Sequence, residues 1–181
     1  MQGNVNEARR PLKTTADLLV VQIPRLRRYA RALTGDENRA DDLVQDCLAR
    51  ALARLKLWKP GTDMRAWLFT IMHNLFVNQC KRQSKQADVT TFAVGNVLQS
   101  YDNSEMDARL SELQSGLQRL APEQREVLLL VNIEGFSYQQ VAGVLDIPSG
   151  TVMSRLHRGR QELLKWMSGE PTARSGLRGV K

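Results

Sequence analysis

Arg155, Arg158 and Arg160 recur at helical spacing toward the C-terminal side of this 181-residue chain. Guanidinium groups hydrogen-bond phosphate oxygens and the edge of guanine, so such a cluster could bind DNA. The surrounding stretch, residues 137–164, reads SYQQVAGVLDIPSGTVMSRLHRGRQELL. It predicts two short helices joined by a tight turn, with the arginines on the second helix. This pattern is typical of a helix-turn-helix that enters the DNA major groove.

The ends of these two helices are predicted by their capping residues. Gly135 can end the preceding helix, and Ser137 with Gln140 makes a capping box that starts the next one. The sequence Asp146-Ile147-Pro148 then stops that helix, and Ser149 can cap the second. An apolar seam should hold the pair together, formed by Val141, Ala142, Leu145, Val152 and Leu156.

A compact stripe of acidic and amide residues marks a second candidate surface. Its members are spaced as i, i+3, i+4 and i+7 on one face of a helix: Asp42, Gln45, Asp46 and Ala49. This face could dock a basic partner, although a solvated helix face near an N-terminus is by pattern alone the more common explanation. The opposite face is apolar and predicts core packing by Leu43, Val44, Cys47, Leu48, Ala51, Leu52 and Leu55.

Aromatic, amide and basic residues gather in the next segment, residues 58–82, which reads WKPGTDMRAWLFTIMHNLFVNQCKR. After a Pro-Gly loop, the polar side of a predicted helix carries Thr70, Asn74, Asn78, Lys81 and Arg82. Aromatics that stack, amides that reach base edges and cations that hold the backbone together suit unstacked bases, so this could be a single-strand binding surface. Trp67 and Phe76 are more often core residues, however. A lone histidine such as His73 more often has a structural or phosphate-contacting role than a catalytic one.

Composition fits a nucleic-acid partner. Lys and Arg number 26 against 19 Asp and Glu, and the formal charge of +7 has the sign that attracts phosphate. No apolar run approaches the ~20 residues of a membrane span, and the N-terminal segment has no signal-peptide pattern, so we expect a cytoplasmic protein without membrane insertion. Cys47 and Cys80 are isolated and lack metal-ligand spacing. We therefore expect free thiols, no metal and no cofactor.

The chain divides into two helical blocks, which predicts an all-α protein of two small domains at residues 16–84 and 108–167. In the first domain, a helix from Leu18 to Leu33 should pack beside the helix of the acidic stripe. Residues 85–107 are rich in Asn, Gln, Ser, Thr and Asp and should form a flexible linker. The polar ends, residues 1–15 and 168–181, are predicted to be disordered. Some apolar linker residues could dock on a domain or a partner: Phe92, Val94, Val97 and Leu98.

Together these segments resemble an extracytoplasmic-function (ECF) RNA polymerase sigma factor of the sigma-70 superfamily. The stretch PRLRRYARALTGDENRADDLVQDCLARAL resembles the start of the family's sigma-2-like helical bundle, and residues 58–82 resemble its minus-10 melting segment. The stretch IPSGTVMSRLHRGR resembles the recognition signature of its sigma-4-like helix-turn-helix domain. Finding both blocks in this order separates the family from other helix-turn-helix proteins. The stretch PGTDMRAWLFTIMHNLF is particularly similar to proteobacterial members tied to the general stress response.

The resemblance implies roles for individual residues. The clamp helices of the largest subunit of core RNA polymerase would bind Asp42, Gln45, Asp46 and Ala49. Minus-10 promoter DNA, with one base flipped into the loop before the helix, would bind Lys59, Thr62, Asp63, Arg65, Trp67, Asn74, Asn78, Lys81 and Arg82. Minus-35 DNA would bind Ser149, Thr151, Met153, Ser154, Arg155, His157 and Arg158. Met153 is apolar where other members often carry Arg or Lys, so its contact could be to a thymine methyl.

The resemblance also implies a transcription initiation factor that is not itself an enzyme, because the chemistry of RNA synthesis belongs to the polymerase. An anti-sigma protein would mask its polymerase surface, and a flexible linker would let the free domains close on each other or on that inhibitor. Two other functions stay open. A stand-alone helix-turn-helix regulator would usually need a dimer interface. A sigma-like decoy that titrates an inhibitor would be expected to lose its DNA-contacting residues.

Overall fold

The computed structural model describes residues 14–87 and 105–168, and every regular element in these ranges is a helix, as predicted. In chain order the elements are α1 (Thr15–Val20), α2 (Ile23–Thr34), α3 (Glu37–Ala53), the short 3₁₀ helix η1 (Leu55–Leu57), α4 (Met64–Ala87), α5 (Glu105–Arg119), α6 (Pro122–Asn132), α7 (Tyr138–Leu145) and α8 (Ser149–Met167). Helix α1 begins within the predicted N-terminal tail, and α4 and α5 extend into the predicted linker. The remaining predictions for residues 1–13, 88–104 and 169–181, including the apolar linker residues, lie outside the described residues.

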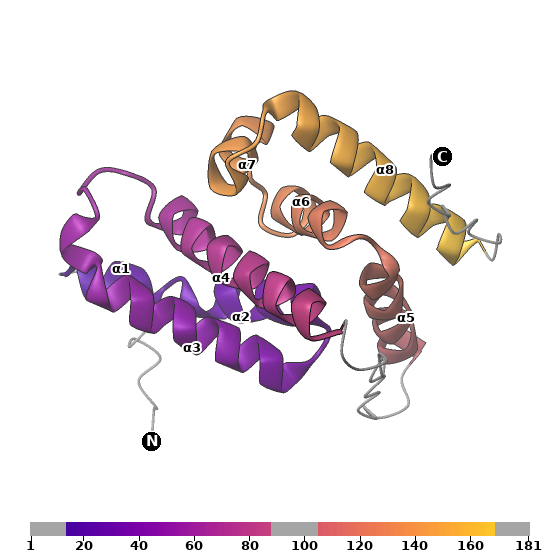
Figure 1. Ribbon diagram of the computed structural model, residues 1–181, viewed down its shortest axis with the longest axis horizontal. Coiled ribbons are helices and arrows are strands. Elements are labelled where there is room, and N and C mark those ends of the chain that lie inside the picture. Colours follow the sequence, from indigo (N-terminus) through magenta and orange to yellow (C-terminus); the bar gives the residue numbers. More distant parts are fainter. Residues whose placement is uncertain (1–13, 88–104, 169–181) are drawn as a thin grey trace, which may run out of the picture.

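Helices α1 to α4 form what we call the first unit, in which α3 packs against both α2 and α4 (Figure 1). Leu26, Leu43 and Leu68 are fully buried at its centre. Most of the apolar face predicted for α3 is confirmed as core, but Leu52 is 57% exposed and does not belong to it. Cys47 lies there too, and burial raises the pKa of its thiol to about 12. This thiol is therefore an inert packing group rather than a reactive one.

The single helix predicted from Leu18 to Leu33 is instead two helices, α1 and α2. The break falls at Val21 and Gln22, just before Pro24 in the first turn of α2. Proline has no N–H to donate, and its ring clashes with the carbonyl four residues earlier, here that of Val20. The same geometry is favourable at a helix start, so Pro24 ends one helix and begins the next.

The turn from α2 to α3 is formed by Gly35 and Asp36. Gly35 adopts a left-handed conformation with φ of 70°, and its N–H donates to the carbonyl of Arg31. Asp36 then caps α3, because its Oδ1 accepts from the N–H of Arg39 at 2.8 Å. A glycine is favoured at such a helix C-terminus because it has no Cβ to clash.

Helices α5 to α8 form the second unit, in which α8 packs along α6 and α7. The predicted capping box is confirmed, since Ser137 and Gln140 exchange backbone-to-side-chain hydrogen bonds at 3.2 and 2.9 Å. Two capping predictions are wrong. Pro148, not Ser149, occupies the N-cap of α8, and no side chain caps that end. Helix α6 ends at Asn132, so Gly135, with φ of 68°, serves the loop that follows.

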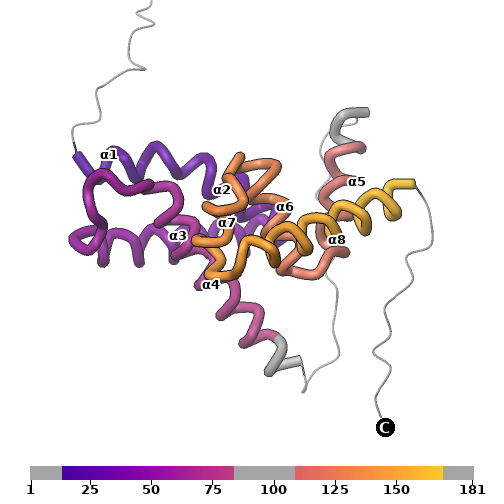
Figure 2. The backbone as a smooth tube through the Cα atoms, turned by 90° about the horizontal axis from the view of Figure 1, so that it is seen from above, coloured from indigo at the N-terminus to yellow at the C-terminus, as the bar shows by residue number. Residues whose placement is uncertain are grey.

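The two units are closed on each other. Helix α7 packs against α4, and α5 and α6 pack against α2, which the two views show from perpendicular directions (Figures 1 and 2). Phe69 of α4 and Phe136 of the α6–α7 loop meet edge to face, with ring centroids 5.4 Å apart. The buried residues of both units therefore belong to one continuous core.

Candidate polymerase and DNA interfaces

The acidic and amide stripe lies on the outer face of α3. All four of its members are exposed: Asp42, Gln45, Asp46 and Ala49. Their neighbours Leu43 and Cys47 are fully buried on the inner face. Core packing of that face therefore fixes the position of the helix that carries the stripe. Within the described residues, neither Asp42 nor Asp46 forms an ion pair. The stripe is a negative patch available to a partner, and its polymerase-binding role stays a prediction.

The loop before α4 is a tight turn with an exposed tip. The N–H and hydroxyl of Thr62 both donate to the carbonyl of Lys59, at 3.1 and 2.8 Å. Asp63 accepts at Oδ1 from the N–H groups of Arg65 and Ala66, at 2.9 and 3.3 Å. Asp63 thus satisfies the free N–H groups at the start of α4. Its side chain has a structural task independent of DNA.

Along α4 the predicted polar side is exposed except for the half-buried Thr70, while most aromatics turn inward. The exposed members are Asn74, Asn78, Lys81 and Arg82. Phe69 and Phe76 are buried, and Trp67 is half-buried against the core. The packing explanation of Phe76 is therefore confirmed. A surface that stacks bases on this helix would have only the exposed part of Trp67 to use.

Two α4 side chains point to the second unit instead of to solvent. Arg65 donates from Nη1 to the carbonyl of Glu134 at 2.9 Å, and its guanidinium lies 3.9 Å from the centre of the Phe136 ring. The Nδ1 atom of His73 lies 2.8 Å from Oε1 of Glu126. The structural role of His73 is thus an ion pair or hydrogen bond across the contact. The partners lie 69 and 53 residues away in sequence, so no local pattern indicates these pairings.

Burial raises the pKa of the Glu126 carboxyl above its ordinary value of 4.5, although the hydrogen bond from His73 acts in the opposite direction. The charged form is therefore disfavoured in the folded protein. Charged or titratable groups that interact with Glu126 come from α2, α4, α6 and α8: Tyr29, His73, Cys80, Glu123, Arg125 and Arg155.

The Glu126→Gln variant should gain thermal stability relative to the wild type as the pH rises from about 4.5 to about 7. A raised folded-state pKa means that the folded protein binds more protons than the unfolded chain in this range, so wild-type stability declines there. Glutamine has no proton to lose and can still accept from His73. Melting temperatures of both proteins across this range test the sign. If the melting temperature of the wild type instead rises relative to that of the variant as the pH rises, the prediction is wrong.

The helix-turn-helix presents one side of α8 to solvent. Ser149, Met153, His157 and Arg158 are exposed, whereas Thr151, Ser154 and Arg155 are half-buried. Ser154 donates its hydroxyl to the carbonyl of Thr151 at 3.0 Å. Arg160, the third arginine of the cluster, donates to Oδ1 of Asn132 at 2.8 Å and so lies beside α6. The exposed residues that are predicted to contact DNA therefore lie in the first half of α8, and their DNA-binding role stays a prediction.

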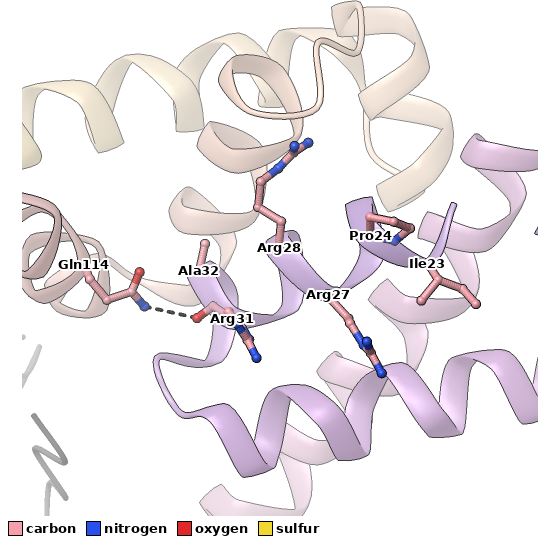
Figure 3. Close-up of a pocket in the computed structure, with 7 residues that line it drawn as sticks. All are labelled: Ile23, Pro24, Arg27, Arg28, Arg31, Ala32 and Gln114. Carbon is pink, nitrogen blue, oxygen red and sulfur yellow. Dashed lines mark hydrogen bonds between the residues drawn. The ribbon is translucent and has the colours of Figure 1, made fainter. Parts of the chain in front are cut away.

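A shallow groove of about 560 Å³ lies where α2 meets α5 (Figure 3). It is lined by Ile23, Pro24, Arg27, Arg28, Arg31, Ala32 and Gln114. Arg28 pairs with Glu134 of the second unit, and Arg31 pairs with Glu37. Because Gln114 belongs to α5 and the other residues to α2, this groove is a feature of the contact between the units.

Within the described residues, no group of His, Cys, Asp and Glu side chains is arranged to hold a metal ion. In the same ranges, no helix combines the length and the apolar character needed to cross a membrane.

Family models match both units in the order that the sequence suggests. A model of the sigma2 domain of PhyR matches residues 19–73, and a model of sigma-70 region 4 matches residues 110–163. The chain is also 36% identical over 147 residues to the ECF RNA polymerase sigma factor EcfG of Rhodopseudomonas palustris, and the match covers 81% of each protein. The chain belongs to the ECF sigma factors. As a sigma factor, it works with core RNA polymerase at promoter DNA in transcription initiation.

Other relatives support the same family. This sigma factor is 36% identical over 135 residues to the ECF sigma factor SigL of Mycobacterium tuberculosis, a match that covers 72% of the chain and 75% of SigL. Among solved structures, it is similar to the sigma factor RpoE of Bartonella quintana in complex with the anti-sigma factor NepR. That match has a TM-score of 0.76 and 29% identity and covers 86% of this chain and 98% of RpoE.

Proposed function

We propose that the three exposed surfaces divide the work of the sigma factor. The outer face of α3 binds core polymerase, the loop before α4 and the polar side of α4 bind minus-10 DNA, and the first half of α8 reads minus-35 DNA. The main support is that most members of each predicted residue set are exposed on one helix or on the loop that precedes it. The half-buried members are Arg65, Trp67, Thr151, Ser154 and Arg155. A rigid helix holds its side chains in fixed register, which specific recognition needs.

At minus 10, the exposed amides and cations of α4 have complementary tasks. Asn74 and Asn78 lie one turn apart and can hydrogen-bond the edges of unstacked bases, while Lys81 and Arg82 attract the phosphate backbone. Asn74 already donates from Nδ2 to the carbonyl of Thr70 at 3.0 Å, which fixes its orientation. The exposed loop tip at residues 59–62 is placed to receive a flipped base, whose extrusion costs a few kcal/mol.

At minus 35, Arg158→Ala should weaken binding to a promoter duplex by about 1–3 kcal/mol if the guanidinium reads a base. If it only holds phosphate, the loss should be similar for all sequences and the salt dependence should become shallower. Titrations of holoenzyme against cognate and scrambled minus-35 duplexes at several salt concentrations separate the two. Lys165→Ala removes the same charge from an exposed position two turns further along α8 and should change little. An Arg158→Ala protein that binds like the wild type would remove Arg158 from the site.

We further propose that an anti-sigma factor controls this protein, that the chain resides in the cytoplasm, and that it supplies specificity while the polymerase supplies the chemistry. The similarity to RpoE solved in complex with NepR supports the first point. A decoy is the second candidate, because one family model is named for the sigma2 domain of PhyR, which is called an anti-anti-sigma factor in a similar structure. That structure is 18% identical, so it supports the fold alone.

Single-round transcription tests these functions directly. Purified core polymerase, the full chain and a genomic fragment library are combined, and the RNA 5′ ends are sequenced. Specific starts that share upstream minus-35 and minus-10 motifs are expected for a sigma factor. Specific DNA binding without starts would favour a stand-alone regulator. If neither is seen, the decoy becomes the better explanation.

A further inference from the structure

The connection between α3 and α4 presents a leucine to solvent. Leu57, the last residue of η1, is 74% exposed, the highest value among the large apolar side chains of the described residues. The connection lies on the side of the molecule away from α8, as both views show (Figures 1 and 2). A single exposed leucine needs no explanation by itself. Its surroundings decide whether it is suited to a partner.

The backbone around Leu57 fixes its outward position. Leu55 and Trp58 share the inner side of this turn and pack with the core, because residues three apart in a 3₁₀ helix lie above each other. Lys56 and Leu57 are left on the outer side. The N–H of Leu57 donates to the carbonyl of Arg54 at 2.8 Å, and the N–H of Trp58 donates to that of Leu55 at 3.2 Å. The leucine is therefore held on an anchored turn.

Positive charge surrounds Leu57. Residues 50–63 carry four cations against one carboxylate, whereas residues 36–49 carry one cation against five carboxylates. The one carboxylate of the second stretch, Asp63, already accepts from two N–H groups of α4. The four cations are exposed, and within the described residues none of them forms an ion pair: Arg50, Arg54, Lys56 and Lys59. We call these four cations together with Leu57 the basic corner.

The change of sign from α3 to the basic corner indicates two different partners. A basic surface that binds the acidic stripe of α3 would be repelled by the basic corner, so the corner requires a partner with negative charge. Its exposed leucine requires a partner with an apolar surface as well. Unstacked DNA offers both, since phosphates run along the strand and each base has an apolar face. Proteins that unstack DNA insert leucine and similar side chains between bases.

The position of Leu57 fits this partner. The loop tip at residues 59–62, which is proposed to receive a flipped base, follows directly in the chain. A Cβ atom added to Gly61 would meet no atom within 4 Å, so the tip borders open space. On α4, by contrast, Phe69 and Phe76 are buried and Trp67 is half-buried. Leu57 thus supplies an apolar surface that the polar side of α4 lacks.

We propose that Leu57 is a wedge that enters the base stack beside the flipped base, while the cations of the basic corner hold the phosphates of the same single strand. This inference rests on the proposed minus-10 role of the loop and α4. When a base leaves the stack, its former neighbours lose a stacking partner, and an inserted apolar side chain offsets part of this loss. The wedge therefore acts on promoter opening and not on binding to the closed duplex.

Promoter opening by the holoenzyme tests the wedge. The probe is a promoter found in the transcription experiment, with 2-aminopurine at a minus-10 position of the non-template strand, where its fluorescence rises on unstacking. For Leu57→Ala the opening rate should fall roughly tenfold, while the affinity for core polymerase should not change. Leu57→Met keeps an apolar side chain and should keep most of the rate. On a template whose minus-10 region is mismatched and already open, Leu57→Ala should transcribe like the wild type.

The cations are tested by binding of the holoenzyme to a single-stranded minus-10 oligonucleotide at several salt concentrations. Arg54→Gln/Lys56→Gln should make the slope of log affinity against log salt shallower by about 1.4, because each phosphate contact on a single strand contributes about 0.7. Arg25→Gln/Lys165→Gln removes the same charge from exposed positions on α2 and α8 and should leave the slope unchanged. An unchanged slope in the first variant would overturn the phosphate-binding role of the corner.

Leu110→Ala is the matched control for the wedge, since Leu110 of α5 is 56% exposed and should leave the opening rate unchanged. Far-UV circular dichroism checks that each variant keeps its helices. The wedge is overturned if Leu57→Ala opens the intact promoter as fast as the wild type. It is also overturned if this variant loses affinity for core polymerase and the mismatched template does not rescue it, because Leu57 would then contact polymerase. If the wild-type holoenzyme does not open the promoter, the proposed minus-10 function fails, and the wedge fails with it.

Discussion

Replacing Asp42 and Asp46 together with alanine is expected to weaken binding to core polymerase by about 2–4 kcal/mol, or roughly 30- to 1000-fold. Both carboxylates are exposed on α3, and neither has a cationic partner among the described residues. Their negative charge is therefore available to an intermolecular contact. Because α3 is anchored by its opposite face, the helix should remain folded and the loss should be specific to binding.

Fluorescence titration of the labelled chain with core polymerase measures this effect. The paired control is Glu112→Ala with Glu162→Ala, which removes two exposed carboxylates from the second unit and gives the same change in net charge. It should bind within about twofold of the wild type, since isolated surface charges contribute little. Loss of helicity in the Asp42 and Asp46 variant would instead support the ordinary explanation, in which these acids stabilise the start of a helix.

Features that depend on neighbours in sequence were predictable. The capping box at Ser137 and Gln140 joins groups three residues apart, and the outer face of α3 follows from helical spacing alone. The break between α1 and α2 was missed even though Pro24 was visible, because apolar periodicity continues through it. Ser149 has the right type for an N-cap, but the helix begins one residue earlier than that role requires.

Contacts between the units could not be predicted, because they join residues far apart in the chain. Arg65 reads as a DNA-binding cation in sequence, and only the fold brings the Glu134 carbonyl and the Phe136 ring to it. Gln114 and Gln118 look like ordinary surface glutamines of an amphipathic helix. Their task becomes visible only when the end of α2 lies opposite them.

The buried Arg125 is expected to be the most important polar residue for stability, and Arg125→Met should lower the free energy of unfolding by about 3–5 kcal/mol. Its guanidinium donates to the carbonyls of Leu33, Leu117, Gln118 and Leu120 and to the side chain of Gln118. These carbonyls end two helices, α2 and α5, so one cation satisfies both C-termini. Methionine would fill much of the volume but would remove these donors, so that the carbonyl of Leu117 would keep only the N–H of Leu120.

The desolvation of the buried Arg125 guanidinium opposes the stabilisation from its hydrogen bonds. Burial lowers the pKa of Arg125 to about 10, so the folded protein carries a desolvation cost that methionine would remove. The group nevertheless stays charged at neutral pH, and a buried carbonyl left unpaired costs about 1–3 kcal/mol. Because four carbonyls lose a donor, the free energy lost with these hydrogen bonds should exceed the desolvation cost that methionine removes. Denaturant unfolding measures the difference, and Arg125→Lys, which can serve some of the carbonyls, should be intermediate.

Arg119→Met provides the matched comparison, because Arg119 is exposed on α5 and only stacks over Trp166, 5.7 Å from the ring centroid. Its loss should cost no more than about 1 kcal/mol. Arg125→Met could instead be as stable as the wild type. The desolvation cost of the guanidinium would then equal the free energy of its hydrogen bonds, and Arg125 would orient the two units without stabilising the fold. In that case the variant should still show a larger radius of gyration, because the carbonyl of Leu33 has lost its donor from the second unit.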